Sequence, residues 1–134
     1  MSFINASETH VNAYVFGGTA VPWAANTNLW LALFTADPTE TGSLAAEATY
    51  GGYARVAVNR STGLTITGAT VTNTNLAQFP VCSSGSSTCT HVGIVDTASG
   101  AVSLMVKGAL NSSVAVTTGI QPQFSATALV FTLD

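Results

Sequence analysis

The stretch LWLALF at residues 29–34 carries six apolar residues in a row and decides how the rest of the chain can fold. Its length is that of a strand rather than a helix, and a turn-rich loop, DPTETGS at residues 37–43, follows it closely. A strand in which apolar and polar residues do not alternate has no polar face that could be exposed to solvent. The stretch therefore predicts a central strand that is buried on both faces.

Shorter segments of alternating apolar and polar residues occur on both sides of this stretch in the sequence, and they predict further strands that can pair with it. Two of them flank Gly68 and indicate a hairpin or a bulge, and two more flank a tight turn at residues 97–100. Strand-like patterns occur at residues 53–58, 64–67, 69–72, 76–81, 91–96, 101–106, 114–117 and 128–133. About eight short strands in a chain of this length predict an antiparallel β-sandwich or jelly roll, formed as one domain over residues 1–134.

One helix is expected, near the N-terminus, over about residues 7–16. Ser7 is a favoured N-cap residue, and the pair Gly17-Gly18 would end the helix. Val11, Tyr14 and Val15 follow the i, i+3, i+4 spacing of an apolar stripe. A helix this short is unstable alone, so we expect it to dock on another part of the molecule or on a partner.

The amino-acid composition argues against some classes of binding partner and favours others. Only 7% of the residues are charged, against about 25% in an ordinary domain. The three basic residues, Arg55, Arg60 and Lys107, are too few to neutralise several phosphates at once, so direct nucleic-acid binding is not expected. No apolar run is long enough to span a membrane. With a formal net charge of −3, self-repulsion is weak, which favours association between subunits.

No catalytic or metal-binding constellation emerges, so we expect neither enzymatic activity nor a cofactor. His91 with Asp96 and one of many serines can be imagined as a triad, but no Gly-x-Ser-x-Gly elbow accompanies them. Six residues separate Cys82 from Cys89, which is not a zinc-knuckle spacing even with His91 nearby. The acids of the loop, Asp37, Glu40 and Glu47, are more widely spaced than calcium loops require.

The two cysteines bound the low-complexity segment CSSGSSTC at residues 82–89, which we expect to be an exposed loop. A disulfide between Cys82 and Cys89 at a hairpin tip would contribute roughly 2–3 kcal/mol by the chain-entropy estimate. Two alternatives stay open, namely free thiols in a reducing cytosol and bonds between subunits.

Several short motifs occur in the chain in an order that resembles that of a known protein family. The segments LWLALFTADP (29–38), GGYAR (51–55), FP (79–80), THVGIVD (90–96), GAL (108–110) and LVFTLD (129–134) run through nearly its whole length. Together they resemble small phage virion proteins of the tail-fibre type, which are similar to jelly-roll subunits that cement or decorate capsids. The Cys82–Cys89 loop is not part of the family pattern.

The resemblance implies a structural role in the virion after assembly in the bacterial cytoplasm, with no catalytic residues. The first expectation is a decoration or cement subunit that binds the major capsid protein and copies of itself, as a dimer or trimer. The alternative is a tail-associated fibre or adsorption protein that contacts tail proteins and the host surface.

Four residues are candidates for the interface. Tyr53 and Arg55 belong to types that are enriched at protein interfaces, although Arg55 can equally pair with Glu47 inside the chain. Trp23 and Tyr50 are the aromatic residues that an adsorption protein would present at a loop end. For Tyr53 and Arg55, which belong to the matched motifs, we expect a core or turn role ahead of an interface role.

Overall fold

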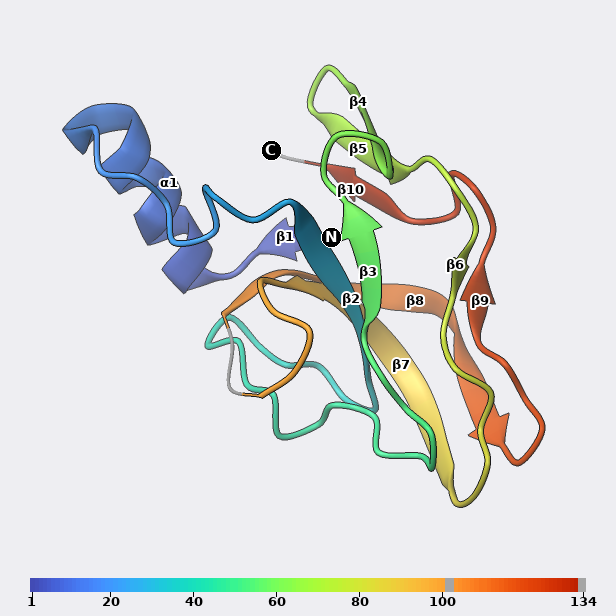
Figure 1. Cartoon of the computed structure of the whole chain (residues 1–134). Helices are drawn as coiled ribbons and strands as arrows, with labels where there is room; N and C mark the ends of the chain where they lie inside the picture. Colours follow the sequence, from blue (N-terminus) through green and yellow to red (C-terminus); the bar gives the residue numbers. More distant parts are fainter. Residues whose placement is uncertain (101–102, 133–134) are drawn as a thin grey trace.

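A computed structural model describes residues 1–100 and 103–132. Strand β2 (Asn28–Phe34) contains the LWLALF stretch and lies inside a five-stranded antiparallel sheet (Figure 1). It pairs with β3 (Val56–Asn59) on one side and with β7 (Ser86–Val95) on the other. Beyond β7 lie β8 (Leu104–Thr117) and the two-residue strand β1 (Ser2–Phe3), so the order is β1-β8-β7-β2-β3.

Both faces of β2 are buried, as the uninterrupted apolar pattern predicts. Leu31 and Leu33 point into the larger core cluster, whereas Ala32 and Phe34 point into a smaller cluster on the opposite face. The smaller cluster is closed by Ile4 at the start of the helix and by Leu44 from the long loop. Successive side chains of a strand alternate between faces, so each face needs its own cover.

Two small antiparallel sheets cover the Leu31 face. One has the order β10-β5-β4 and the other pairs β6 with β9. Their strands are β4 (Leu64–Thr67), β5 (Thr70–Asn73), β6 (Ala77–Gln78), β9 (Gln123–Phe124) and β10 (Val130–Thr132). The mainly β, antiparallel fold class with one helix is therefore confirmed, although the described residues form ten strands in three sheets rather than about eight.

The two hairpins that the sequence predicts are present. Strands β4 and β5 pair across Gly68, whose φ of 61° is the left-handed conformation that glycine adopts without strain. Strands β7 and β8 form the long hairpin at the centre of the sheet. Gly93 of β7 is tightly enclosed there, since a Cβ on it would lie 2.6 Å from Leu104 Cδ1 and 2.9 Å from the carbonyl oxygen of Val106. The strand predicted at residues 101–106 begins at 104, and residues 101–102 lie outside the described part of the chain.

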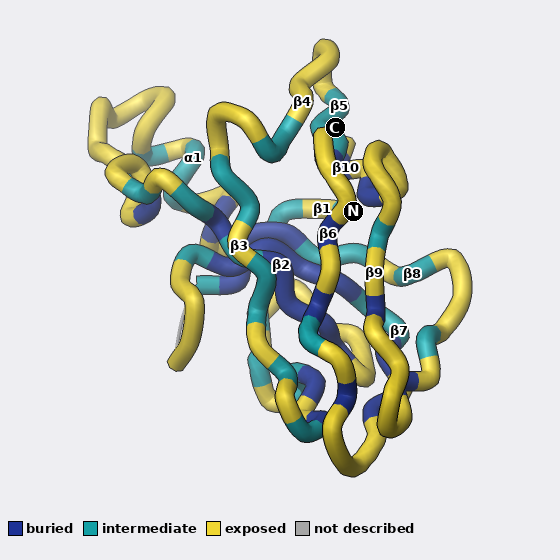
Figure 2. Tube along the Cα trace, turned by 45° about the vertical axis from the view of Figure 1, so that its right-hand side comes forward, coloured by how far each residue is buried: buried dark blue, intermediate teal, exposed yellow. Residues whose placement is uncertain are grey.

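Helix α1 (Asn5–Gly17) is present, but its predicted start at Ser7 is wrong. Ile4 occupies the N-cap position, and Ser7 lies inside the helix with a buried hydroxyl that has no partner among the described residues. The helix ends at Gly18 as expected, with the Gly18 N–H donating to Tyr14 O at 3.2 Å. It projects from the side of the sheets in Figure 1, and Figure 2 shows it largely exposed. At 13 residues it is too short to cross a membrane, and the described residues include no helix that could.

Candidate functional site

The connection between β2 and β3 is long, and its backbone folds back onto the strand that precedes it. The N–H of Ala48 donates to Leu33 O at 2.8 Å, and that of Thr35 donates to Ala46 O at 2.8 Å. An isolated antiparallel bridge joins Phe34 to Glu47. These bonds place the Glu47 side chain beside the edge of the core, where a lone carboxylate would be poorly hydrated.

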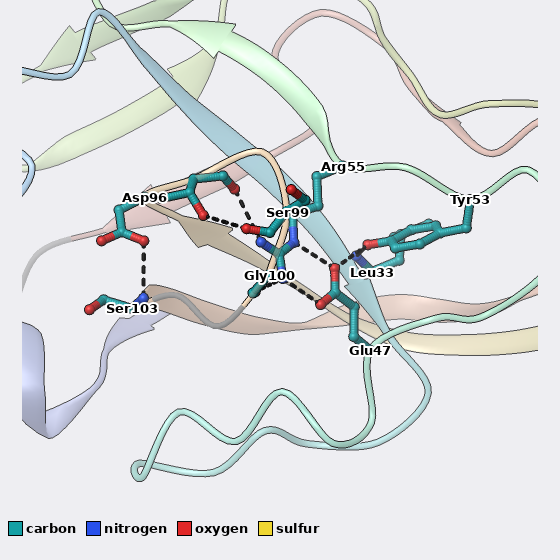
Figure 3. Close-up of polar contacts among 9 residues, drawn as sticks. Leu33, Glu47, Tyr53, Arg55, Asp96, Ser99, Gly100 and Ser103 are labelled. Atoms are coloured by element: carbon teal, nitrogen blue, oxygen red, sulfur yellow. Dashed lines mark hydrogen bonds and ion pairs between the residues drawn. The ribbon is translucent and has the colours of Figure 1, made fainter.

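Arg55 compensates the charge of Glu47 through a two-pronged ion pair (Figure 3). Its Nε donates to Oε1 at 2.7 Å and its Nη2 donates to Oε2 at 2.7 Å, while only 5% of the Arg55 side chain and 16% of the Glu47 side chain are exposed. The Tyr53 hydroxyl donates to Glu47 Oε1 at 2.9 Å and accepts the N–H of Leu33 at 3.1 Å. Bidentate pairs of this kind are strong and geometrically specific.

The same guanidinium also holds the turn between β7 and β8. Nη1 of Arg55 donates to Thr97 O at 3.1 Å and Nη2 donates to Gly100 O at 3.2 Å (Figure 3). The hydrogen bonds that Arg55 donates to Glu47 raise the pKa of Arg55, and burial raises the pKa of Tyr53 well above its usual range. Arg55 therefore joins the long loop, the strand edge and the β7–β8 turn, and it acts as a structural residue within the chain.

A second ionic contact fixes the other end of the long loop. Lys107 Nζ on β8 lies 3.0 Å from Asp37 Oδ1 and 3.0 Å from Glu40 Oε1. The Lys107 ammonium and the Thr39 N–H lower the pKa of Asp37, while the two carboxylates raise the pKa of Lys107. Since Glu47 pairs elsewhere, the three acids of this loop do not converge on a common point, and the described residues contain no cluster of three metal-binding side chains.

The third basic residue is also engaged within the chain. Arg60 Nη1 donates to three backbone carbonyls of one turn, those of Trp23 at 2.8 Å, Ala24 at 3.2 Å and Asn26 at 3.0 Å. All three cations thus have internal partners. The charged side chains that could have steered a partner instead organise loops and turns.

Of the four candidate interface residues, Trp23 and Tyr50 are buried, and Tyr53 and Arg55 are partly buried and bonded within the chain. Trp23 and Tyr50 are 6% and 3% exposed, so the aromatic loop end expected of an adsorption protein is not formed by them. Tyr50 donates its hydroxyl to Pro80 O at 2.9 Å, and its ring meets Tyr53 edge-on at 5.4 Å. Of the two alternatives for Arg55, the internal pairing with Glu47 is the one observed. Sequence alone could not rank these roles, because aromatic and arginine residues serve cores and interfaces equally well.

The predicted disulfide is not formed, since both cysteines are free thiols and both are buried. Cys82 Sγ donates toward Ser84 O at 3.2 Å and lies 3.5 Å from Gly85 O, so it stabilises the turn that precedes β7. Cys89 lies within β7, opposite Val114 of β8, and burial raises its pKa. The predicted loop at residues 82–89 is therefore a loop only over residues 82–85, and residues 86–89 belong to β7. Pairing of Ser87 and Cys89 with a distant strand overrides the loop propensity of their sequence.

The exposed apolar surface lies where the sequence predicted a docked helix face. Tyr14, Val15 and Phe16 are 59%, 60% and 86% exposed at the end of α1. A separate apolar cavity of about 180 Å³ opens between the β10-β5-β4 sheet and the β1 end of the large sheet. It is lined by Met1, Phe3, Leu29, Ala69, Val71, Ile94, Met105, Val106, Phe131 and Thr132.

This small antiparallel β-protein engages its three basic side chains within the chain and exposes several large apolar side chains, which is typical of a subunit that binds other proteins. Residues 2–132 match the model of the family described as podophage GP4 fiber I protein gp80. The chain belongs to this family, and it is therefore a phage virion structural protein of the fibre type. No curated protein matches the chain.

Proposed function

We propose that this chain is a decoration or cement subunit that binds the outer shell of the major capsid protein and stabilises it. The observation that carries the proposal is the neutral surface. No Asp, Glu, Lys or Arg occurs between Arg60 and Asp96, a stretch that contains four complete strands, β4 to β7, of which β4 is largely exposed. Such a surface suits close protein–protein contact, because little charge has to be desolvated when it is covered.

The internal ion pairs support the same role. Glu47 with Arg55 and Lys107 with Asp37 fix the long loop before any partner binds. A preordered subunit loses less conformational entropy on docking than a flexible one. Many such modest contacts, repeated over a shell, would resist internal pressure.

A second candidate is a tail-associated fibre or adsorption protein, and the fibre description of the family favours it. The burial of Trp23 and Tyr50 removes the aromatic residues that sequence patterns had offered for host recognition. Receptor binding would then have to use the exposed apolar side chains, such as Ile66 on β4 or Val81 in the segment that precedes β7.

A non-enzymatic role is part of the proposal. His91 is engaged through Nδ1 with the Thr90 hydroxyl at 2.9 Å, and His10 lies edge-on against Trp23 at 5.5 Å between ring centroids. Among the residues that the structure describes, neither histidine is paired with a carboxylate in the way a general base requires.

The discriminating experiment is the copy number of this protein in purified particles, measured by quantitative mass spectrometry against the major capsid protein. A ratio near one, or a simple fraction of one, supports the cement role. A few copies per particle would contradict it and assign the protein to the tail or a vertex. Immunogold labelling of intact particles provides an independent control on location.

A further inference from the structure

We propose that copies of this chain bind one another through α1, with the aromatic end of the helix of one copy seated in the apolar cavity of the next. Phe16 would enter the cavity, and Tyr14 and Val15 would cover its rim. The inference goes beyond the proposed function, because it does not depend on whether the subunit sits on the capsid or on the tail.

Helix α1 buries little of its surface against its own chain. Ser7 is its only fully buried residue, and the helix contacts strand β8 and, through His10, the ring of Trp23. An isolated helix of fewer than about 12–15 residues is marginal in water. Its largest apolar side chains, those of Tyr14, Val15 and Phe16, follow one another at the far end, and more than half of each is exposed.

The cavity has the size and the chemistry of a site for one aromatic ring. Its volume is about 180 Å³ and its walls are almost entirely apolar. An apolar protein cavity of about 150 Å³ stays free of water and binds benzene, which has the dimensions of a phenylalanine ring. The cavity is thus large enough for Phe16 without requiring any polar group to be desolvated.

Strand register extends the apolar wall of the cavity outward. Phe131 of β10 pairs with Val71 of β5, and Val71 pairs with Ile66 of β4, so the three side chains form one row on the same face. Exposure rises along this row from 6% at Phe131 to 72% at Ile66. The row therefore leads from the cavity to an exposed apolar rim, which offers a surface to Tyr14 and Val15.

The occupant has to come from a second copy. The cavity is lined by Phe3 at the start of the chain, and α1 then leads away from it; from Ile4 to Phe16 a helix rises about 18 Å. Both surfaces are uncharged, and both are present on every copy. A contact between two different surfaces of identical chains is heterologous, so it closes into a ring such as a trimer or continues as a chain of subunits.

Two complementary variants test this contact. Phe16→Ala removes the side chain that enters the cavity, and Ala69→Trp fills the cavity from an exposed turn position that lines it. Oligomeric state is measured by size-exclusion chromatography with light scattering, and circular dichroism checks that each variant is folded. Ile120→Ala, at an exposed apolar position away from both surfaces, is the matched control.

We expect oligomers for the wild type and for the control, and monomers for each test variant alone. Loss of the buried ring should weaken self-association by about 10- to 100-fold. A mixture of the two variants should form a one-to-one dimer and nothing larger, because one intact helix end meets one intact cavity. A monomeric wild type, unchanged association of Phe16→Ala, or a mixture that stays monomeric would each overturn the proposal. Copy number on the particle is unaffected by these outcomes, so the two proposals fail independently.

Discussion

Removing Arg55 should destabilise the protein more than any other single change to a charged residue. Arg55→Ala deletes two bonds of 2.7 Å to Glu47 and the bonds to Thr97 O and Gly100 O, and it leaves a carboxylate that is 84% buried. Breaking a buried pair from one side costs about 3–5 kcal/mol. Since the Tyr53 hydroxyl still donates to Glu47, we expect the lower end, about 3 kcal/mol.

The assay is equilibrium unfolding in urea, with thermal unfolding as a second readout. A loss of 3 kcal/mol corresponds to a fall in Tm of roughly 6–12 °C for a domain of this size. Arg55→Lys keeps the charge but cannot form the bidentate ion pair, so its free energy of unfolding should lie between those of the wild type and Arg55→Ala. Replacing Glu47 with Gln in the Arg55→Ala background should recover part of the loss, because the unpaired charge disappears. If Arg55→Ala lies within 1 kcal/mol of wild type, the burial argument is refuted.

Three further predictions follow from other contacts. Lys107 and the Thr39 N–H lower the pKa of the Asp37 carboxyl, so its contribution to stability is present above the unfolded pKa of about 3.9 and is lost as the pH falls through the lower folded value. This contribution is about 0.5 kcal/mol at a half-exposed site, and Lys107→Ala should reduce it, as measured by urea unfolding at a series of pH values. Gly93→Ala should destabilise by about 1–3 kcal/mol in urea, whereas Gly17→Ala, where a Cβ has room, should be neutral within about 0.5 kcal/mol. The Cys89 thiol should react with a maleimide only at the rate of unfolding, and rapid labelling in the native state would show that it is accessible.

The contacts of Arg55, Arg60 and Lys107 explain how a chain with so few charged residues keeps its long loops ordered. Each cation joins segments that are distant in sequence, with Lys107 and Asp37 separated by 70 positions. Neutral side chains then remain for the outer surface. This division of roles suits a subunit of a particle, in which the exterior has to be covered by other proteins.

The amino-acid pattern by itself determined the strands and the class of fold. An apolar run such as residues 29–34 favours burial on both faces, and the alternating segments around Gly68 indicated a hairpin or a bulge, of which the hairpin is observed. Those are local consequences of side-chain periodicity. The tertiary structure decided everything that depended on which distant segments meet. It turned the interface candidates Trp23 and Tyr50 into core residues, left Cys82 and Cys89 as separate thiols, and exposed the helix stripe at Tyr14 and Val15, because burial is set by neighbours that no local pattern specifies.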